Sequence, residues 1–383
     1  MKKVRYGIVG IGKQGTFYTK MFTKLGFLLP GAELTAVCDI SEDRRAYAEK
    51  NLKGVKVFSD YNEMFASGLI DVAMVVTPHY FHPEIACAAF KAGLNVLCDK
   101  PAGVYTKQVR EMNAEADKHP DLLFGMMFNQ RTNPKYIKAK EIIESGKLGE
   151  LKRIVWIITN WYRPRAYYAQ GGWRGTWWGE GGGVLLNQCP HQLDLFTWLA
   201  GLPESVTATL ATRGRDINVE NDVTAYCKFK NGATGVFITS THDAPGTNRL
   251  EITGDGGKIV IEKGKLVFTE NKIPEPEFSR VNEVFMGKPK TRKHVYRGIG
   301  EYLAIFKRPF QHLGIIRNYT DYLLGKTDKF IAPGREGITG LTFSNAIHLA
   351  GWTGKEVRLP LDEEQFIAEL EKRKEEEKAS SKK

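Results

Sequence analysis

The feature that most constrains the fold of this chain is a G-x-G-x-x-G pattern directly after the first apolar run. Its six residues are Gly10, Ile11, Gly12, Lys13, Gln14 and Gly15. Glycines between a strand and a helix let the backbone approach a pyrophosphate, whose charge then faces the positive N-terminus of the helix. Asp39 ends the next predicted strand, where such a fold offers a carboxylate to ribose hydroxyls. The pattern therefore predicts a nicotinamide dinucleotide site.

The first 125 residues alternate short apolar runs with helical stretches, an order typical of βαβ units and a parallel sheet. Strands are predicted at Val4–Val9, Glu33–Asp39, Val55–Phe58, Asp71–Thr77, Asn95–Asp99 and Leu122–Phe128. Helices are predicted between them at Gly15–Leu28, Glu42–Asn51, Tyr61–Ser67, Pro83–Ala92 and Lys107–Lys118. Two mononucleotide-binding halves require this rhythm, so we expect a doubly wound Rossmann domain over residues 1–127.

Beyond a predicted linking helix at Asn133–Ser145, long alternating runs indicate an antiparallel sheet with one covered face. These runs are Leu151–Tyr162, Val206–Thr212, Val223–Phe229, Ala233–Thr241 and Arg249–Ile261. We expect an α/β protein in which residues 128–365 form an α+β domain around a large open, mostly antiparallel sheet. A charged tail is predicted at 366–383. The uncovered sheet face suggests a homo-oligomer, either a dimer or a tetramer.

Composition narrows the class of protein. A chain of 383 residues favours two domains, and its 42% hydrophobic and 26% charged residues are ordinary for a soluble protein. It has no run of eighteen apolar residues and no apolar core after Met1, so we expect a cytoplasmic protein with no membrane partner. The five cysteines are odd in number and lack C-x-x-C spacing, which argues against disulfides and zinc. No metal is predicted.

The formal net charge of +11 raises the question of nucleic acid. The excess is diffuse apart from the basic segment Lys288–Arg308 and the Lys/Glu-rich end from Glu363 to Lys383. For the basic segment, a surface that attracts anionic substrates or favours solubility is preferred to nucleic-acid binding. The Lys/Glu-rich end has nearly balanced charges, which predicts a solvated helix that frays into a disordered tail.

The cofactor preference depends on the residues around Asp39. A carboxylate at this position would repel a 2′-phosphate, so NAD is favoured over NADP. Arg44 and Arg45 follow closely and weaken that preference, because an arginine near the ribose accommodates the extra phosphate.

Two further segments leave neighbouring strands at the same edge of the predicted sheet. They are expected to complete the cofactor site with Thr77, Pro78, His79, His82, Asp99 and Lys100. Ligands of such sheets bind outside the carboxyl ends of the strands, so the Lys100 cation is expected to point into the cleft. Pro101 then ends the strand. A solvated turn is the alternative for Lys100, and a helix-start role is the alternative for His82.

A third cluster lies on a predicted helix at Val184–Ala200, which three glycines at 181–183 open. Asn187, His191 and Asp194 are spaced i, i+4 and i+7, so they would share one face of that helix. A lone histidine in such a helix is more often a satisfied core residue. A histidine flanked by an amide and a carboxylate is more typical of a positioned acid or base.

With these motifs the chain resembles the Gfo/Idh/MocA oxidoreductases, which include glucose–fructose oxidoreductase and inositol dehydrogenases, over nearly its whole length. The family's T-P-N-x-x-H, E-K-P and G-G-G-x-x-x-D-x-x-x-H-x-x-D motifs match Thr77–His82, Asp99–Pro101 and Gly181–Asp194. The resemblance implies a catalytic pair of Lys100 and His191, with a substrate site between the Rossmann domain and the open sheet.

The resemblance also implies substrate-lining residues. Asn129 and Asn160 match positions that line the substrate in inositol dehydrogenases, and Trp173 with Arg174 resembles a pair near cofactor or substrate.

The chain departs from the family pattern at three positions. His79 replaces the usual Asn and Asp99 the usual Glu, whereas Asn187 replaces an Asp in the third motif. The last change bears on mechanism, because an amide orients a ring or a hydroxyl but cannot titrate. Proton handling would then rest on His191 and Lys100.

The substrate is constrained only by class. The stretch Trp156–Trp178, which includes Tyr162, is dense in aromatic side chains that suit either a sugar ring or sheet packing and a dimer interface. Asn129, Asn160, Asn187 and His242 are polar groups that suit a polyol, such as a pyranose, a glycoside or an inositol.

We therefore expect an NAD-dependent dehydrogenase that oxidises a ring hydroxyl. In the alternative of a redox-assisted glycosidase, transient oxidation acidifies a neighbouring C–H, the aglycone leaves, and the cofactor is recycled. The remaining alternative is a non-catalytic NAD-sensing protein.

Overall fold

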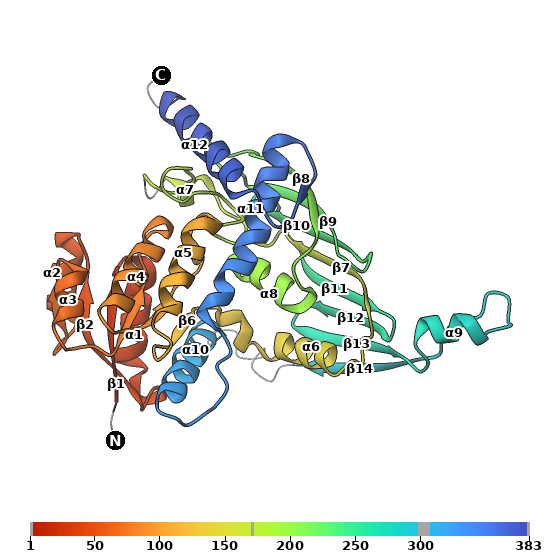
Figure 1. The fold of residues 1–383 in the computed structure, drawn as a ribbon, viewed down its shortest axis with the longest axis horizontal. Helices are drawn as coiled ribbons and strands as arrows, with labels where there is room; N and C mark the ends of the chain where they lie inside the picture. Colours follow the sequence, from red (N-terminus) through yellow and green to blue (C-terminus); the bar gives the residue numbers. More distant parts are fainter. Residues whose placement is uncertain (1–2, 170–171, 298–306, 381–383) are drawn as a thin grey trace. The chain divides into compact units, whose positions relative to one another are not determined.

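The computed structural model describes residues 3–169, 172–297 and 307–380 (Figure 1). By internal contacts the chain divides into two units. The first contains Met1–Thr132 and Ile305–Leu341, and the second contains Asn133–Ala304 and Thr342–Lys383.

The first unit is built on a six-stranded parallel sheet in the order β3-β2-β1-β4-β5-β6. The strands are β1 Val4–Val9, β2 Ala32–Cys38, β3 Lys56–Phe58, β4 Val72–Val75, β5 Asn95–Cys98 and β6 Phe124–Met126. Its helices are α1 Lys13–Lys24, α2 Glu42–Asn51, α3 Tyr61–Ala66, α4 His82–Lys91, α5 Thr106–Asp117 and α10 Lys307–Leu323. This strand order confirms the predicted Rossmann fold and places its topological switch point between β1 and β4.

Residues 305–341 return to the first unit, although the sequence prediction placed them in the second domain. The reason is packing of α10 against the Rossmann sheet. Tyr319 is fully buried, and its hydroxyl donates to the Leu123 carbonyl at 2.7 Å. The Tyr6 and Thr320 hydroxyls are hydrogen-bonded at 2.8 Å. The described Rossmann unit is therefore completed by a segment about 180 residues beyond its last strand.

The second unit is built on a nine-stranded sheet in the order β14-β13-β12-β11-β7-β10-β9-β8-β15. The strands are β7 Leu151–Ile158, β8 Ser205–Ala211, β9 Asp222–Lys228, β10 Thr234–Ser240, β11 Asn248–Gly254, β12 Gly257–Glu262, β13 Lys265–Asn271, β14 Thr291–Arg297 and β15 Val357–Arg358. Neighbouring strands are antiparallel except β7 and β10, which confirms the predicted open, mostly antiparallel sheet.

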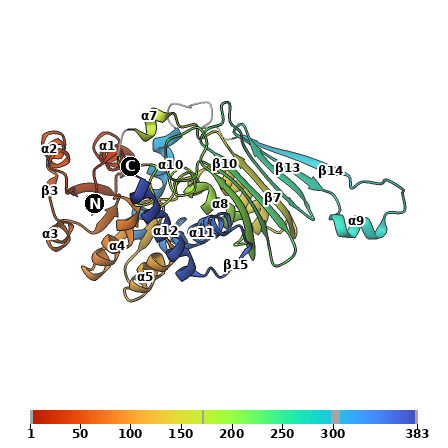
Figure 2. The same cartoon turned by 90° about the horizontal axis from the view of Figure 1, so that it is seen from above.

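Helices cover one face of this sheet (Figure 2). The helices of the unit are α6 Pro134–Glu144, α7 Arg165–Tyr168, α8 Pro190–Ala200, α9 Glu275–Val281, α11 Gly337–Thr353, which begins in the first unit, and α12 Glu363–Ser380. Tyr136 of α6 contacts Trp156 of β7, and Phe196 of α8 packs with Phe237 of β10 and Phe343 of α11. The alternate side chains on β7 and β10 stay half-buried on the other face.

Three predicted elements differ from the structure. The predicted helix Val184–Ala200 begins only at Pro190, and the run Arg249–Ile261 is a hairpin of β11 and β12. The Lys/Glu-rich end is helical, as predicted, but the helix continues to Ser380 and is not solvated throughout, because Phe366, Leu370 and Glu377 are buried. Phe366 packs on Trp352 and Glu377 accepts from the Trp177 N–H, so α12 contributes to the core of the second unit.

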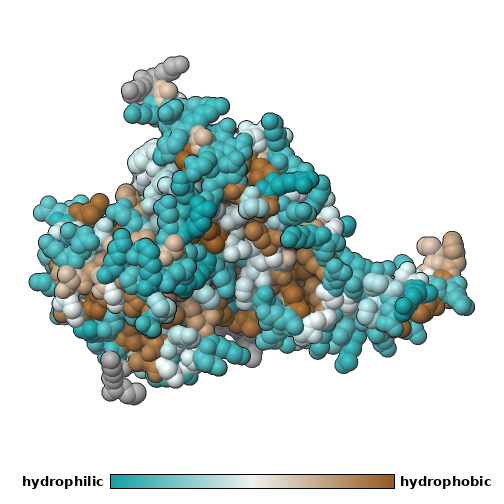
Figure 3. Space-filling view, viewed as in Figure 1, coloured by the Kyte–Doolittle hydropathy of each residue, from teal (hydrophilic) through white to brown (hydrophobic). Residues whose placement is uncertain are grey.

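The stretch Asn271–Lys290 contains α9 and projects from the β13–β14 end of the sheet (Figures 1 and 2). Apolar side chains gather near its tip (Figure 3), where Val284, Phe285 and Met286 are 68%, 93% and 76% exposed. Of the basic segment, Thr291–Arg297 forms β14, whereas residues 298–306 and the side chains of 307–309 lie outside the described residues. Among the described helices none has the length and apolar character needed to cross a membrane.

Candidate active site

The glycine motif forms a close turn between β1 and α1. Gly10 has a φ of +90°, and a Cβ there would lie 2.7 Å from the Val76 carbonyl oxygen. A Cβ at Gly15 would lie 2.0 Å from the Gly10 carbonyl oxygen, so α1 can pack against the strand only with glycine at that position. At Gly12 a Cβ would meet nothing within 4 Å. The backbone at the start of α1 therefore faces open space, which fits the close approach of a pyrophosphate.

Asp39 lies directly after β2 and faces the glycine motif. Its carboxylate accepts from the Ile11 N–H at 2.8 Å and from the Ser41 N–H at 2.9 Å. Arg45 donates to the backbone carbonyls of Asp39 and Ile40, at 3.0 and 2.8 Å. This arginine, which weakened the preference for NAD, thus holds the backbone of the loop, and the contact of the Asp39 carboxylate with a ribose stays a prediction.

The loops after β4 and β5 are joined by His82. Its two ring nitrogens lie 2.7 Å from the Pro101 and Thr77 carbonyl oxygens, and the ring is 1% exposed. Burial lowers the pKa of this histidine. Since both ring nitrogens face protein carbonyls, His82 stabilises the two loops from behind. His82 is also the first residue of α4, which bears out its alternative role at a helix start, and its contact with the cofactor stays a prediction.

The same two loops place the other predicted residues beside the glycine motif. The Thr77 methyl carbon would lie 3.1 Å from a Cβ on Gly10, and the buried Thr77 hydroxyl has no hydrogen-bond partner among the described residues. His79 is buried, Pro78 is exposed, and Lys100 is half-buried at the carboxyl end of β5. The Asp99 carboxylate accepts from the Lys100 backbone N–H at 2.9 Å. Thr77 and Asp39 therefore both lie beside the glycine motif, and the unsatisfied Thr77 hydroxyl fits a bound dinucleotide.

Asn187 is not on the helix that carries His191. Pro190 is the first residue of α8, and Cys189 occupies the N-cap position with φ −105° and ψ 10°, outside the helical range. The predicted face shared by Asn187, His191 and Asp194 is therefore wrong for Asn187. His191 is half-buried in the first turn of α8, and Asp194 is 2% exposed.

Hydrogen bonds to Glu180 and from Tyr167 instead fix Asn187. Its amide N–H donates to Glu180, and its carbonyl accepts from the Tyr167 hydroxyl at 3.3 Å. Arg174 donates to the same hydroxyl at 3.0 Å and lies 3.8 Å from the Glu180 carboxylate. The Arg174 guanidinium also lies over the Trp173 ring, 4.7 Å from its centroid. The structure thus joins three residues predicted at the substrate, Trp173, Arg174 and Asn187.

Glu180 and Tyr167 were not predicted as site residues. Glu180 is 1% exposed, and burial raises its pKa to about 7. Its position before the three glycines was a visible signal, but only the fold shows that its side chain turns inward.

A second buried glutamate supports the glycine turn that follows. The Glu220 carboxylate accepts from the N–H groups of Gly183 and Leu185 at 2.9 and 3.0 Å. Behind it, His348 of α11 lies 3.1 Å from the Glu220 carboxylate. The turn is therefore held from within the second unit, and a Cβ on Gly183 would lie 1.9 Å from the Glu220 carbonyl oxygen.

The remaining predicted substrate residues lie on other segments than the cluster around Asn187. Asn160 and Tyr162 are exposed after β7, and the His242 ring lies 3.1 Å from Asp222. Asn129 follows β6 in the first unit, where its amide nitrogen lies 3.1 Å from the His312 ring. Its buried carbonyl oxygen has no partner among the described residues.

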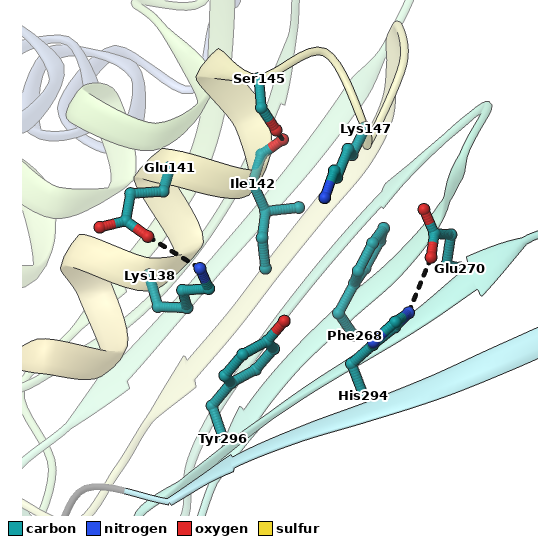
Figure 4. A pocket seen from close by; sticks show the side chains of 9 residues that line it. All are labelled: Lys138, Glu141, Ile142, Ser145, Lys147, Phe268, Glu270, His294 and Tyr296. Carbon is teal, nitrogen blue, oxygen red and sulfur yellow. Dashed lines mark hydrogen bonds and ion pairs between the residues drawn. The ribbon is translucent and has the colours of Figure 1, made fainter.

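A pocket in the second unit contains none of the predicted site residues (Figure 4). Its lining residues are Lys138, Glu141, Ile142, Ser145, Lys147, Phe268, Glu270, His294 and Tyr296. Two internal ion pairs satisfy part of its charge, Lys138 with Glu141 and His294 with Glu270. Within the described ranges no three His, Cys, Asp or Glu side chains gather as a metal-binding group.

Family models match both units of the chain. Residues 4–126 match the oxidoreductase family with an NAD-binding Rossmann fold, and residues 136–260 match the GFO/IDH/MocA C-terminal domain. The chain belongs to the Gfo/Idh/MocA family. It is therefore an oxidoreductase with an NAD-binding domain.

Relatives in this family have named substrates. The myo-inositol 2-dehydrogenase of Thermotoga maritima is 26% identical over 67% of this chain and 74% of its own length. The levoglucosan dehydrogenase of Pseudarthrobacter phenanthrenivorans is 25% identical over 68% of this chain and 74% of its own length. The crystal structure of the WlbA dehydrogenase from Bordetella pertussis, in complex with NADH and UDP-GlcNAcA, is 26% identical with a TM-score of 0.75. That comparison covers 94% of this chain and 100% of the other.

Within this Gfo/Idh/MocA member, Lys100 lies in the first unit and His191 in the second. Their pairing remains a prediction, as do the contacts of each residue with cofactor or substrate.

Proposed function

We propose that this chain is an NAD-dependent dehydrogenase that oxidises a ring hydroxyl of a sugar, glycoside or inositol. The observation that carries the proposal is the glycine motif between β1 and α1. Its backbone faces open space at Gly12, between the Asp39 carboxylate and the unpartnered Thr77 hydroxyl. The inositol and levoglucosan dehydrogenases among its relatives support an alcohol as substrate.

The second unit supplies groups that suit a polyol. The Arg174 guanidinium, the Tyr167 hydroxyl and the Asn187 amide are linked by hydrogen bonds at the surface of one loop cluster. Trp173 adds an aromatic face beside them. Aromatic faces with a few fixed polar groups are typical of sites for sugar rings, which present an apolar face and a rim of hydroxyls.

The reaction requires a hydride to leave carbon while a base takes the hydroxyl proton. Bound NAD supplies the nicotinamide carbon that accepts the hydride. We assign the base to His191, in the first turn of α8. Lys100, at the end of β5, donates to the same substrate oxygen and stabilises the developing alkoxide. Asn187 orients a hydroxyl but carries no proton away.

A screen for NAD reduction tests this function. The purified protein is given NAD or NADP with inositols, free pyranoses and glycosides, and NADH formation is followed by absorbance. We expect NADH with at least one polyol, and a lower KM for NAD than for NADP because a carboxylate beside the ribose would repel a 2′-phosphate. Failure to reduce either cofactor with any of the three classes would overturn the proposal, and glycoside cleavage without net NADH would favour recycling of the cofactor.

We also propose a homo-oligomer through the open face of the nine-stranded sheet. Val155, Ile157, Val236 and Ile238 are half-buried on that face, whereas the opposite side chains of β7 and β10 are covered by helices. The molar mass of the purified protein by light scattering tests this assembly.

A further inference from the structure

The amide that replaces the family's carboxylate at position 187 is hydrogen-bonded to another carboxylate. Glu180 lies seven residues earlier and accepts from the Asn187 side-chain N–H. The second Glu180 oxygen accepts from the Gly175 N–H at 2.8 Å. Glu180 is nearly fully buried, whereas Asn187 is half-buried and is the more accessible of the two.

Three hydrogen bonds run in one direction from Arg174 through Tyr167 and Asn187 to Glu180, and an ion pair between Glu180 and Arg174 closes the ring. Tyr167 donates to the Asn187 carbonyl, which turns the Asn187 N–H groups toward Glu180. Arg174 donates to the Tyr167 hydroxyl, and its guanidinium lies 3.8 Å from the Glu180 carboxylate. Glu180 is therefore linked to Arg174 directly and also through Asn187 and Tyr167. A change in the charge of Glu180 therefore changes what holds both Asn187 and Arg174 in place.

We propose that Glu180 is a positioning residue of the substrate site, which through its ionised carboxylate holds Asn187 and Arg174 in the orientation that binds the polyol. This inference rests on the proposed function, because Asn187 and Arg174 are assigned there to the substrate. In this chain Glu180 is the titrating carboxylate in place of the family's Asp at position 187. It acts on the substrate through Asn187 and Arg174 rather than by direct contact.

The ionisable groups around Glu180 come from several segments of the second unit. Arg174 lies on the preceding loop, Tyr168 on α7, and Glu220, with its partner His348 of α11, lies before β9. Burial raises the pKa of Glu180 to about 7, against the hydrogen bonds from Gly175 and Asn187 and the charge of Arg174, which lower it. Glu180 therefore exchanges its proton near neutral pH.

The dependence of the substrate KM on pH tests this role. With the best polyol from the screen, or with myo-inositol, we expect the wild-type KM to rise several-fold as pH falls from 8 to 6. Glu180→Gln keeps the shape of the side chain but not the titration. In this variant we expect the KM to be raised and independent of pH over that interval, while the KM for NAD is unchanged.

A matched control is Glu377→Gln. Glu377 is also buried and also contacts this loop, but through the backbone N–H groups of Trp177 and Trp178 and the side chain of Asn218. We expect this variant to keep the wild-type dependence of KM on pH. An unchanged pH dependence in Glu180→Gln, or its equal loss in both variants, would overturn the proposed role.

Tryptophan fluorescence supplies a measurement that needs no substrate, because Trp173 carries the Arg174 guanidinium on its ring. We expect a transition near pH 7 in the wild type that is absent from Glu180→Gln. Failure of the wild type to oxidise any polyol would overturn the proposed function together with the substrate role of Glu180. Turnover with the same pH dependence in both proteins would overturn the role of Glu180 alone.

Discussion

At the scale of single residues, the glycines and the aspartate of the predicted cofactor site could be predicted from sequence. The buried Glu180 that supports the predicted substrate residues could not. Gly10, Gly12 and Asp39 have a fixed order along one strand, one turn and the next strand, so local spacing is enough to find them. Glu180 has no such spacing. Its importance comes from burial and from contacts with Arg174 and Asn187, which depend on how the chain folds back.

The raised pKa of Glu180 gives a stability prediction. Its folded-state pKa of about 7 lies above the unfolded value of 4.5, so the native protein holds a proton that the unfolded chain has released. Between these values the free energy of unfolding falls as pH rises, by up to roughly 3 kcal/mol. Glu180→Gln should lack this contribution.

Urea unfolding of the second unit at pH 5 and pH 8, in the wild type and the variant, measures the difference. An equal fall in both proteins would contradict the assigned ionisation of Glu180.

At the scale of elements, the buried apolar strands of the parallel sheet were predicted well because helices cover both of its faces. The helix Val184–Ala200 was predicted too long, because its apolar pattern continues through the glycine turn while Pro190 sets the actual start. The tail was predicted as solvated because charges outnumber Phe366 and Leu370, which nevertheless pack inward.

Helix α12 holds the loop that bears Arg174 and Glu180. The Glu377 carboxylate accepts from the Trp177 N–H at 3.2 Å, the Trp178 N–H at 3.0 Å and the Asn218 side chain at 2.8 Å. Glu377→Ala would leave the buried Trp177 N–H and two part-buried donors without their acceptor, at a cost of about 1–3 kcal/mol in the free energy of unfolding.

We expect a lower Tm and a higher KM for the polyol, with the KM for NAD unchanged. The exposed Glu376→Ala on the same helix is the control. A variant at Glu377 that matched this control in both Tm and KM would show that α12 does not hold the loop.

At the scale of the whole molecule, the fold class followed from the change in pattern near residue 130, from buried parallel strands to alternating ones. The assignment of residues 305–341 to the Rossmann unit did not follow, because it depends on packing between segments far apart in sequence. The proposed chemistry likewise depends on two units, since Lys100 leaves β5 in the first and His191 begins α8 in the second.

The pairing of Lys100 with His191 is the central claim, and a double-mutant cycle on kcat/KM tests it most directly. We expect Lys100→Ala and His191→Ala each to lower kcat/KM by about 10²–10⁴-fold, with NADH binding retained and the exposed Lys91→Ala as a neutral control. Because the two groups act on one substrate oxygen, the double variant should lose little more than the worse single variant. Losses that multiply in the double variant, or near wild-type turnover in either single one, would contradict the pairing.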